Sequence, residues 1–520
     1  MVISFPYTGS LTFFVFISWI PLLLIEYTIS KQKYRSSKVY IHALITFLIY
    51  NLGSTWWIWN ASPEGAVFAI VLNALIMAFV FYFFHKIKKN YSENSGYLLL
   101  IFTWVSFEFI HYHWELSWPW LNFGNVFSIT PQFVQWYSIT GVLGGTFWIL
   151  LINIISFIIF RNRYLCNKKS SNQVKNFILL GSVFLIPLIY SLISYYRYEE
   201  TKNPAEVVSI QPNIDPYNEK FTTELKGQLD KIFNQADQKV TSKTKFILAP
   251  ETAISATFFE EDLQSLPFFN YTIQRKKRWG EAAFYTGAST LCFFEEKKSA
   301  ASRKIEGGPG FIESYNTSLL INQYNIPYFV HKSKLVLGVE KIPFLKVLPW
   351  LEQLAINLDG ASGSLGVETE PKVLYANNVS FAPSICYESI YGDFISKQVK
   401  KGAELIFVIT NDGWWGDTPG YKQHASFSRL RAIENRRSIA RSANTGISCF
   451  INQRGDMTKK TNWWKETSIR GELNKNSELT FYSKNGDVIG KLFSFILVFI
   501  VGFELVKSII KIISRNKIKN

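Results

Sequence analysis

Seven long apolar segments constrain the fold of this chain more than any other feature. Each is near or above the roughly 20 residues that an α-helix needs to cross a bilayer. They are residues 11–30, 40–60, 65–85, 97–116, 134–160, 177–196 and 490–512. The first is too long for a cleaved signal peptide and has no basic residues before it, so we interpret it as a retained span. The sequence therefore predicts a multi-span helical membrane domain.

The basic residues are concentrated in every second loop between these segments. Clusters occur at 31–38, 86–89 and 161–175 and at the C-terminus, whereas 1–10, 60–64 and 117–133 contain no Lys or Arg. Because basic loops remain in the cytoplasm, this pattern predicts a multi-pass protein with residues 200–485 on the other side of the membrane. In a bacterium this corresponds to the inner (cytoplasmic) membrane, with residues 200–485 in the periplasm. The pattern also accounts for the net charge of +16 without nucleic-acid binding.

The middle of the chain has the composition of a soluble domain. Its pattern predicts strands at 207–214, 245–251, 282–289, 315–322, 379–386, 403–411, 447–452 and near 478–482, and helices at 219–239 and 422–443. Alternating strands and helices favour an α/β sandwich with helices outside. We therefore predict a transmembrane domain at 1–198 with about six spans, a soluble domain at 199–487, and a C-terminal transmembrane helix with a basic cytoplasmic tail at 488–520.

Three chemically reactive residues follow apolar strands of this middle part. They are Glu251 after FILAP, Lys332 after YFVH and Cys386 after VSFAPSI. A lone cysteine is more often a buried packing residue. A thiol at a strand end, where backbone N–H groups converge, is also suited to be a nucleophile. The ordered combination of carboxylate, lysine and thiol therefore favours covalent catalysis.

Several stretches carry a resemblance to a known family. They are FILAPE (246–251), Lys332 with Glu340 eight residues later, SICYES (384–389), NDGWWG (411–416), QH (423–424), ANTGIS (443–448), and the membrane stretch from WPW (118–120) to Gly144. The chain resembles the apolipoprotein N-acyltransferases, membrane-embedded members of the nitrilase superfamily. It departs from the family at 337–339, where Leu-Gly-Val replaces the common Pro-Phe-Gly.

The resemblance implies a multi-span α-helical membrane domain joined to a nitrilase-like αββα sandwich. It implies transfer of an acyl chain from a phospholipid donor to the α-amino group of a lipoprotein's diacylglyceryl-cysteine. Cys386 would form the thioester, Glu251 would act as general base, and Lys332 would stabilise the oxyanion with a backbone N–H near Tyr387. Glu340 and Glu388 match supporting carboxylates.

Aromatic residues provide the candidate substrate-binding sites. Trp118 and Trp120 lie in a loop, 114–133, that reads equally well as an aromatic belt at the headgroups or as a lipid-facing vestibule. Trp414 and Trp415 belong to the NDGWWG stretch, although such residues can also be core or interface aromatics. We assign all four to substrate binding.

Other functions fit the sequence less well. A Cys–His hydrolase would need a suitably placed histidine, an amidase for small substrates would not need six further spans, and a transporter would not need the three reactive residues together. The four cysteines form no CxxC pair, and His111-x-His113-x-Glu115 fits a polar interfacial loop better than a metal site. We therefore predict no metal, no cofactor and no nucleic-acid partner, and expect a monomer.

The family usually has eight spans with both ends in the cytoplasm. Here residues 4–7 resemble the turn between the family's first two spans, so the first span is expected to be missing and the N-terminus to be periplasmic. The alternative is that the true start of the protein lies upstream.

Overall fold

The computed structural model describes residues 1–519 except 10, 167–172, 221 and 346–363. The chain divides into two compact units. One is helical and comprises Met1–Trp56, Val67–Leu192 and Asp487–Asn520; the other contains the sheets and comprises Trp57–Ala66 and Ile193–Gly486. The segment Trp57–Ala66 therefore belongs to the unit that contains the sheets, although it lies between two apolar segments of the sequence. Lys168 and Lys169 of the third basic cluster lie outside the described residues.

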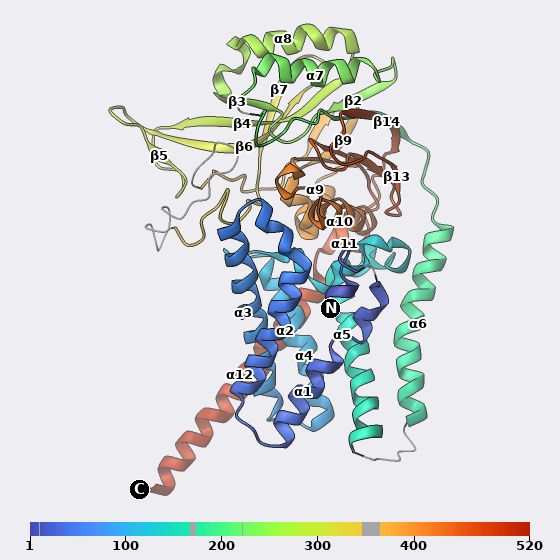
Figure 1. The fold of residues 1–520 in the computed structure, drawn as a ribbon, viewed down its shortest axis with the longest axis vertical. Coiled ribbons are helices and arrows are strands. Elements are labelled where there is room, and N and C mark those ends of the chain that lie inside the picture. The colour runs from blue at the N-terminus through green and yellow to red at the C-terminus, as the bar shows by residue number, and fades with distance from the viewer. Residues whose placement is uncertain (10, 167–172, 221, 346–363, 520) are drawn as a thin grey trace. The chain divides into compact units, whose positions relative to one another are not determined.

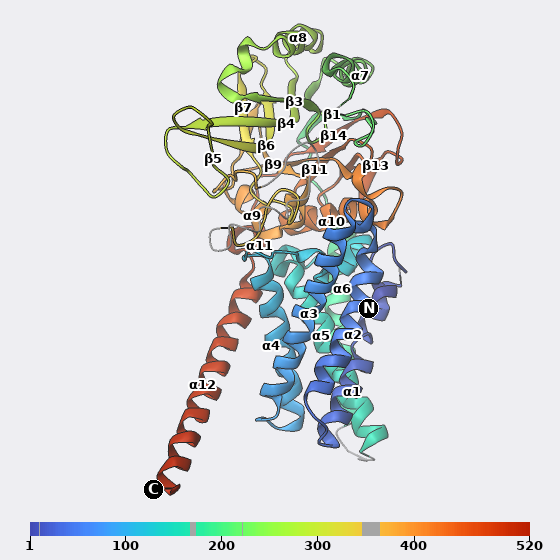
Figure 2. The ribbon, with the colours of Figure 1, turned by 60° about the vertical axis from the view of Figure 1, so that its left-hand side comes forward.

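The helical unit is built from long apolar helices, several of which run side by side in Figure 2. They are α1 (Ile20–Lys31), α2 (Ser37–Thr55), α3 (Pro63–Lys88), α4 (Glu93–His111), α5 (Tyr137–Phe160), α6 (Gln173–Arg197) and α12 (Val488–Lys519). Among the described residues, five stretches are long and apolar enough to cross a membrane: Thr12–Lys31, Ser37–Asn60, Pro63–Lys88, Tyr137–Leu165 and Val174–Arg197. The other two predicted spans form α4 and α12, and their crossing of the membrane stays a prediction.

Two buried carboxylates tie these helices together. Glu26 of α1 accepts hydrogen bonds from Lys88 of α3 at 2.5 Å and from the Tyr97 hydroxyl of α4 at 2.8 Å. Glu108 of α4 accepts one from the Thr146 hydroxyl of α5 at 2.6 Å. An unpaired carboxylate within apolar helices would be strongly destabilising, so each is retained only with such partners. These contacts give both residues a structural role.

Two facing sheets form the core of the second unit. The first has the order β14-β1-β2-β4-β6-β5, with β3 on β4 and β7 on β6; the second has the order β13-β12-β11-β10-β9-β8. The first sheet contains β1 (Pro204–Gln211), β2 (Thr244–Leu248), β3 (Ile254–Phe259), β4 (Ala283–Phe294), β5 (Arg303–Lys304), β6 (Phe311–Ile321), β7 (Pro327–His331) and β14 (Thr467–Asn474). The second contains β8 (Leu374–Ala376), β9 (Val379–Ile385), β10 (Leu405–Thr410), β11 (Ser438–Ala443), β12 (Cys449–Ile451) and β13 (Met457–Lys460).

Alternation along the strands separates two apolar layers. Phe246 of the first sheet packs between the sheets against Phe381 and Phe407 of the second, with ring centroids 5.5 and 5.0 Å away. The next residue, Ile247, faces the opposite layer, which α7 (Leu225–Asp237) and α8 (Pro267–Lys276) cover. Figure 1 shows these two helices lying over the first sheet. We call this the outer face of the first sheet.

The second sheet is covered in the same way by α9 (Gly392–Lys400) and α10 (Pro419–Asn435). The four layers confirm the predicted αββα sandwich. The central strand β10 is covered on one face by the first sheet and on the other by helices. Both of its faces are therefore buried, and all its residues are apolar except Thr410.

Two sequence predictions are wrong in this unit. The predicted helix 422–443 ends at Asn435, because Arg436 adopts a left-handed conformation with φ of +49°, and 438–443 forms β11 within the second sheet. The predicted strand near 478–482 is instead the start of α11 (Phe481–Asn485), where Thr480 caps the helix by accepting the Ser483 N–H at 2.9 Å. The last strand is β14, and it pairs with β1.

Candidate functional site

Glu251 and Lys332 form a buried ion pair beside the ends of two strands. Glu251 follows β2, and Lys332 directly follows β7. Lys332 Nζ lies 3.0 Å from Glu251 Oε1, and the two side chains are only 1% and 6% exposed. Gly287 of β4 lets the backbone of Glu251 pack closely against that strand, since a Cβ at this position would lie 2.6 Å from the Glu251 Cα. The pair is therefore largely shielded from solvent, and its charges interact strongly with neighbouring groups because the local dielectric constant is low.

Asn316 of β6 links this pair to Glu340. Its side-chain Nδ2 donates to Glu251 Oε1 and to Glu340 Oε1, at 2.8 Å each. Lys332 Nζ also lies 2.8 Å from Glu340 Oε1. One lysine thus serves two carboxylates, and the asparagine fixes the spacing between them. Sequence analysis missed Asn316, because its strand, FIESYNTSLLI, contains several polar residues and nothing in the sequence distinguishes this one.

Cys386 occupies a strained position at the end of β9. It is the first residue of a short 3-10 helix, Cys386–Ile390, and its φ of +50° lies in the left-handed region. For a residue with a side chain this conformation costs about 1–3 kcal/mol, and such strain is concentrated at functional sites. The Ser389 hydroxyl donates to the Cys386 carbonyl at 2.7 Å and helps to hold the turn.

The charges of these groups are coupled. Burial would raise the pKa of Glu251, but the Lys332 ammonium and the Asn316 amide hold it below its usual value. Burial would lower the pKa of Lys332, but Glu251 and then Glu340 raise it well above its usual value. Burial and then the Glu251 charge raise the pKa of the Cys386 thiol well above its usual range. At neutral pH the resting site therefore combines a carboxylate, an ammonium and a neutral thiol.

Glu388 connects the two segments that carry Lys332 and Cys386. Its Oε1 accepts the Ser333 N–H at 2.6 Å, and its Oε2 accepts the Ile385 N–H at 2.8 Å. Burial raises the pKa of Glu388 to about 7, although these backbone donors favour its charged form. Tyr387, between Cys386 and Glu388 in the sequence, is also buried.

A second polar network lies behind Cys386. His424 Nε2 lies 3.1 Å from the Cys386 carbonyl oxygen, and its Nδ1 lies 2.8 Å from Asp412 Oδ1. Arg441 Nη2 lies 2.7 Å from Asp412 Oδ2, and the side chains of Asp412, His424 and Arg441 are fully buried. Both ring nitrogens of His424 are thus engaged, and Nε2 contacts the backbone of Cys386. His424 therefore supports the backbone of the turn that carries Cys386.

The candidate substrate-binding tryptophans fall in both units. In the unit that contains the sheets, Trp414 packs against Tyr217 and Trp415 packs against Trp57, with ring centroids 4.9 and 4.7 Å apart. In the helical unit, Trp118 stacks on Trp120 at 5.8 Å, and Trp120 is only 1% exposed. Their binding of substrate stays a prediction.

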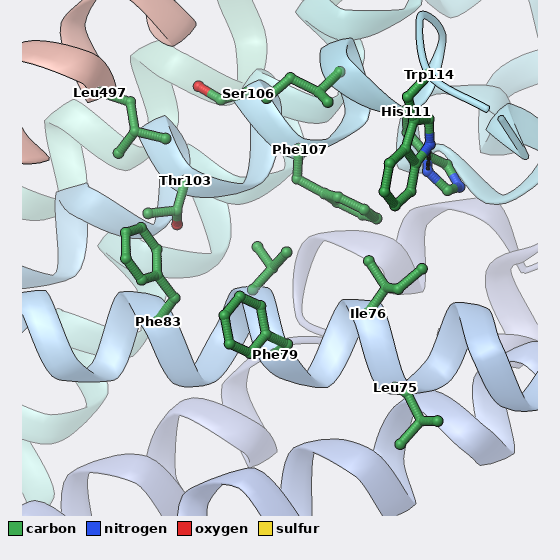
Figure 3. Close-up of a pocket in the computed structure, with 12 residues that line it drawn as sticks. Leu75, Ile76, Phe79, Phe83, Thr103, Ser106, Phe107, His111, Trp114 and Leu497 are labelled. Atoms are coloured by element: carbon green, nitrogen blue, oxygen red, sulfur yellow. Dashed lines mark hydrogen bonds between the residues drawn. The ribbon is translucent and has the colours of Figure 1, made fainter. Parts of the chain in front are cut away.

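The helical unit contains a separate apolar pocket of about 450 Å³ (Figure 3). It is lined mainly by α3 and α4, with Leu497 of α12. Trp114 Nε1 donates to His111 Nδ1 at 2.9 Å at one end of this pocket, as the dashed line in Figure 3 shows. The remaining walls are largely apolar, so the pocket suits a hydrocarbon chain better than a polar molecule.

Comparisons with known proteins cover both units. A model described as the apolipoprotein N-acyltransferase N-terminal domain matches residues 1–155, and the carbon-nitrogen hydrolase model matches residues 207–478. The apolipoprotein N-acyltransferase of Chlorobaculum tepidum is 28% identical over 484 residues, covering 91% of this chain and 89% of that protein. The one from Geobacter metallireducens is 26% identical over 456 residues, covering 85% and 80%.

Among solved structures, a CN-hydrolase superfamily protein of Xanthomonas campestris is 14% identical, with a TM-score of 0.36, and the match covers 52% of this chain and 91% of that one. The two family models carry the assignment together: the carbon-nitrogen hydrolase match spans more than half of the chain, and the N-terminal match is to the apolipoprotein N-acyltransferase domain. The chain belongs to the apolipoprotein N-acyltransferases, the membrane-embedded acyltransferases of the nitrilase superfamily.

Proposed function

We propose that this acyltransferase moves a fatty acyl chain from a membrane phospholipid to the α-amino group of the N-terminal diacylglyceryl-cysteine of lipoproteins. The observation that carries the proposal is the strained Cys386 turn, whose thiol lies within the electrostatic influence of the buried Glu251–Lys332 pair. A neutral thiol beside a carboxylate that stays ionised is ready for deprotonation at the moment of attack.

In the first half-reaction, Glu251 takes the Cys386 proton, and the thiolate attacks the phospholipid ester carbonyl. Lys332, with a backbone N–H near Tyr387, stabilises the resulting oxyanion. The C–O bond breaks, the lysophospholipid leaves with the proton, and the acyl group remains as a thioester on Cys386. In the second half-reaction, Glu251 takes a proton from the attacking α-amine, the amide forms, and the thiolate of Cys386 is released and reprotonated.

Glu340, Asn316 and Glu388 would position these groups. Asn316 and Glu340 hold the lysine and the general base at fixed spacing. Glu388 ties the chain after Lys332 to the strand before Cys386. The tryptophans Trp118, Trp120, Trp414 and Trp415 would contact the lipid substrates, and the pocket between α3 and α4 offers a place for an acyl chain.

The test uses the purified full-length protein with labelled phospholipid and a diacylated lipopeptide. We expect a covalent acyl adduct that hydroxylamine releases, and none in Cys386→Ala. Glu251→Gln and Lys332→Ala should each slow acylation at least about 10²-fold. Cys449→Ala is the matched control, since this buried thiol of β12 takes no part in the site. Acylation of the lipopeptide by Cys386→Ala would show that the thioester route is wrong.

We also propose that the enzyme lies in the inner membrane with the sheet-containing unit in the periplasm, and that it acts as a monomer. Tyr324 is 74% exposed in this unit, and Tyr34 is 49% exposed in the first basic loop. In cells with a permeabilised outer membrane, an impermeant maleimide should label Tyr324→Cys but label Tyr34→Cys only after lysis of the inner membrane. The reverse pattern would contradict the proposed topology. Light scattering of the detergent-solubilised protein tests the monomer.

A further inference from the structure

A second cluster of reactive side chains lies apart from the Cys386 site. Ligand atoms of Glu260, Cys292 and His331 all lie within 4.8 Å of one another. His331 Nε2 lies 2.7 Å from Glu260 Oε1, and the Cys292 thiol is hydrogen-bonded to the same carboxylate. Carboxylate, imidazole and thiol groups are the side chains that bind Zn²⁺ in proteins, and here they lie close enough together to hold one ion.

Regular secondary structure holds all three residues. Cys292 lies in β4, His331 ends β7, and Glu260 begins the short helix Glu260–Ser265 immediately after β3. These strands are adjacent, since β3 and β6 pair with β4, and β7 pairs with β6. Ligands on paired strands are positioned more precisely than ligands on loops, because the ladder hydrogen bonds fix their spacing.

Neighbouring side chains orient two of these ligands. The Thr290 hydroxyl donates to Glu260 Oε1 at 2.7 Å, and the Tyr315 ring stacks on the His331 imidazole with centroids 3.8 Å apart. Such support is typical of metal ligands, whose orientation depends on the groups around them. The side chains of His331 and Glu260 are 16% and 18% exposed, so an ion and a water molecule can reach them.

We propose that Glu260, Cys292 and His331 bind a Zn²⁺ ion. Sulfur, nitrogen and oxygen ligands together suit this borderline ion, and three protein ligands leave one tetrahedral position for water. The thiolate and the carboxylate together supply two negative charges that balance the ion. Without metal, burial and then the Glu260 carboxylate raise the pKa of the Cys292 thiol to about 12, so binding releases one proton.

The site lies across the first sheet from the catalytic cluster. Neighbouring residues of a strand point to opposite faces, so His331 points to the outer face while Lys332 points between the sheets. Tyr315 and Asn316 of β6 are divided in the same way. A bound ion would therefore tether the strand end from which Lys332 extends without entering the catalytic cluster. This inference goes beyond the proposed acyl transfer and does not depend on it.

The test uses the full-length protein in detergent with Cys386→Ala, because Cys386, Asp412 and His424 also have ligand atoms within 4.8 Å of one another. Titration with Co²⁺, the spectroscopic substitute for Zn²⁺, should reach one equivalent. It should produce thiolate-to-cobalt charge-transfer absorption in the near ultraviolet and the d–d bands of tetrahedral Co²⁺ in the visible. Zn²⁺ should displace the Co²⁺ and abolish both absorptions.

Further substitutions in the same background identify the ligands. Cys292→Ser should remove the charge-transfer band, and His331→Gln should weaken Co²⁺ binding by at least about 10-fold. Cys449→Ser should leave the spectrum unchanged, because that thiol is fully buried elsewhere. Unchanged melting temperatures without metal would show that the variants are folded. Absence of the band from the parent protein, or its persistence in Cys292→Ser, would overturn the proposal.

Discussion

We predict that removing one charge of the buried Asp412–Arg441 ion pair destabilises the second sheet, which carries Cys386. Asp412→Asn keeps the shape of the side chain but removes its charge. The Arg441 guanidinium, 2.7 Å away and fully buried, would then lack its counter-charge. Breaking a buried ion pair in this way costs about 3–5 kcal/mol. At 1.36 kcal/mol per tenfold change in the folding equilibrium constant, that cost corresponds to about 10²- to 10⁴-fold.

Hydrogen exchange of the full-length protein, followed by mass spectrometry, measures this loss of stability separately for each segment. Amides of β10, which ends just before Asp412, and of β11, which contains Arg441, should lose protection on the order of 10²–10⁴-fold in Asp412→Asn. Acyl transfer should fall as well, because Asp412 holds His424, whose Nε2 contacts the Cys386 carbonyl. The helices α3 and α4 of the other unit should exchange as in the wild type.

Asp417→Asn is the matched control. Asp417 lies 3.7 Å from Lys422, but its side chain is 67% exposed, and pairs of this kind contribute only about 0–1 kcal/mol. Protection in the control should therefore stay within about tenfold of the wild type. If Asp412→Asn retains the same protection as Asp417→Asn, the reasoning from burial is refuted.

Two further predictions concern Glu251. Gly287→Ala would place a Cβ 2.4 Å from the Thr252 nitrogen and should cost about 1–3 kcal/mol while lowering acyl-transfer activity, whereas Gly227→Ala in α7 has open space and should not lower that activity. Because the folded pKa of Glu251 lies below its usual 4.5, its stabilising contribution is present above about pH 4.5 and is lost as pH falls. The difference in melting temperature between wild type and Glu251→Gln should therefore shrink on acidification from pH 7 to pH 4; a constant difference would contradict the assigned shift.

The sequence by itself determined the class of this protein. Apolar segments of about 20 residues have few folded solutions other than membrane helices, and period-two strands between helices favour a layered sandwich. The strand ends also identified Glu251, Lys332 and Cys386 as candidates, although the first two follow strands of the first sheet and Cys386 follows β9 of the second. The errors came at Arg436 and Thr480. At both places the local sequence is ambiguous. The left-handed conformation of Arg436 ends α10, and the N-cap Thr480 begins α11.

Only the tertiary structure decided which residues meet. Asn316 of β6 meets Glu251 after β2 because both strands pair with β4, and no spacing along the chain indicates that contact. His424 and Asp412 lie behind Cys386 because β10 lies between β9 and β11 in the second sheet. Glu260, Cys292 and His331 are separated by more than thirty residues at each step, yet converge across adjacent strands. Periodicity along a strand specifies which face a side chain takes, whereas strand order specifies its neighbours, and strand order is a property of the whole fold.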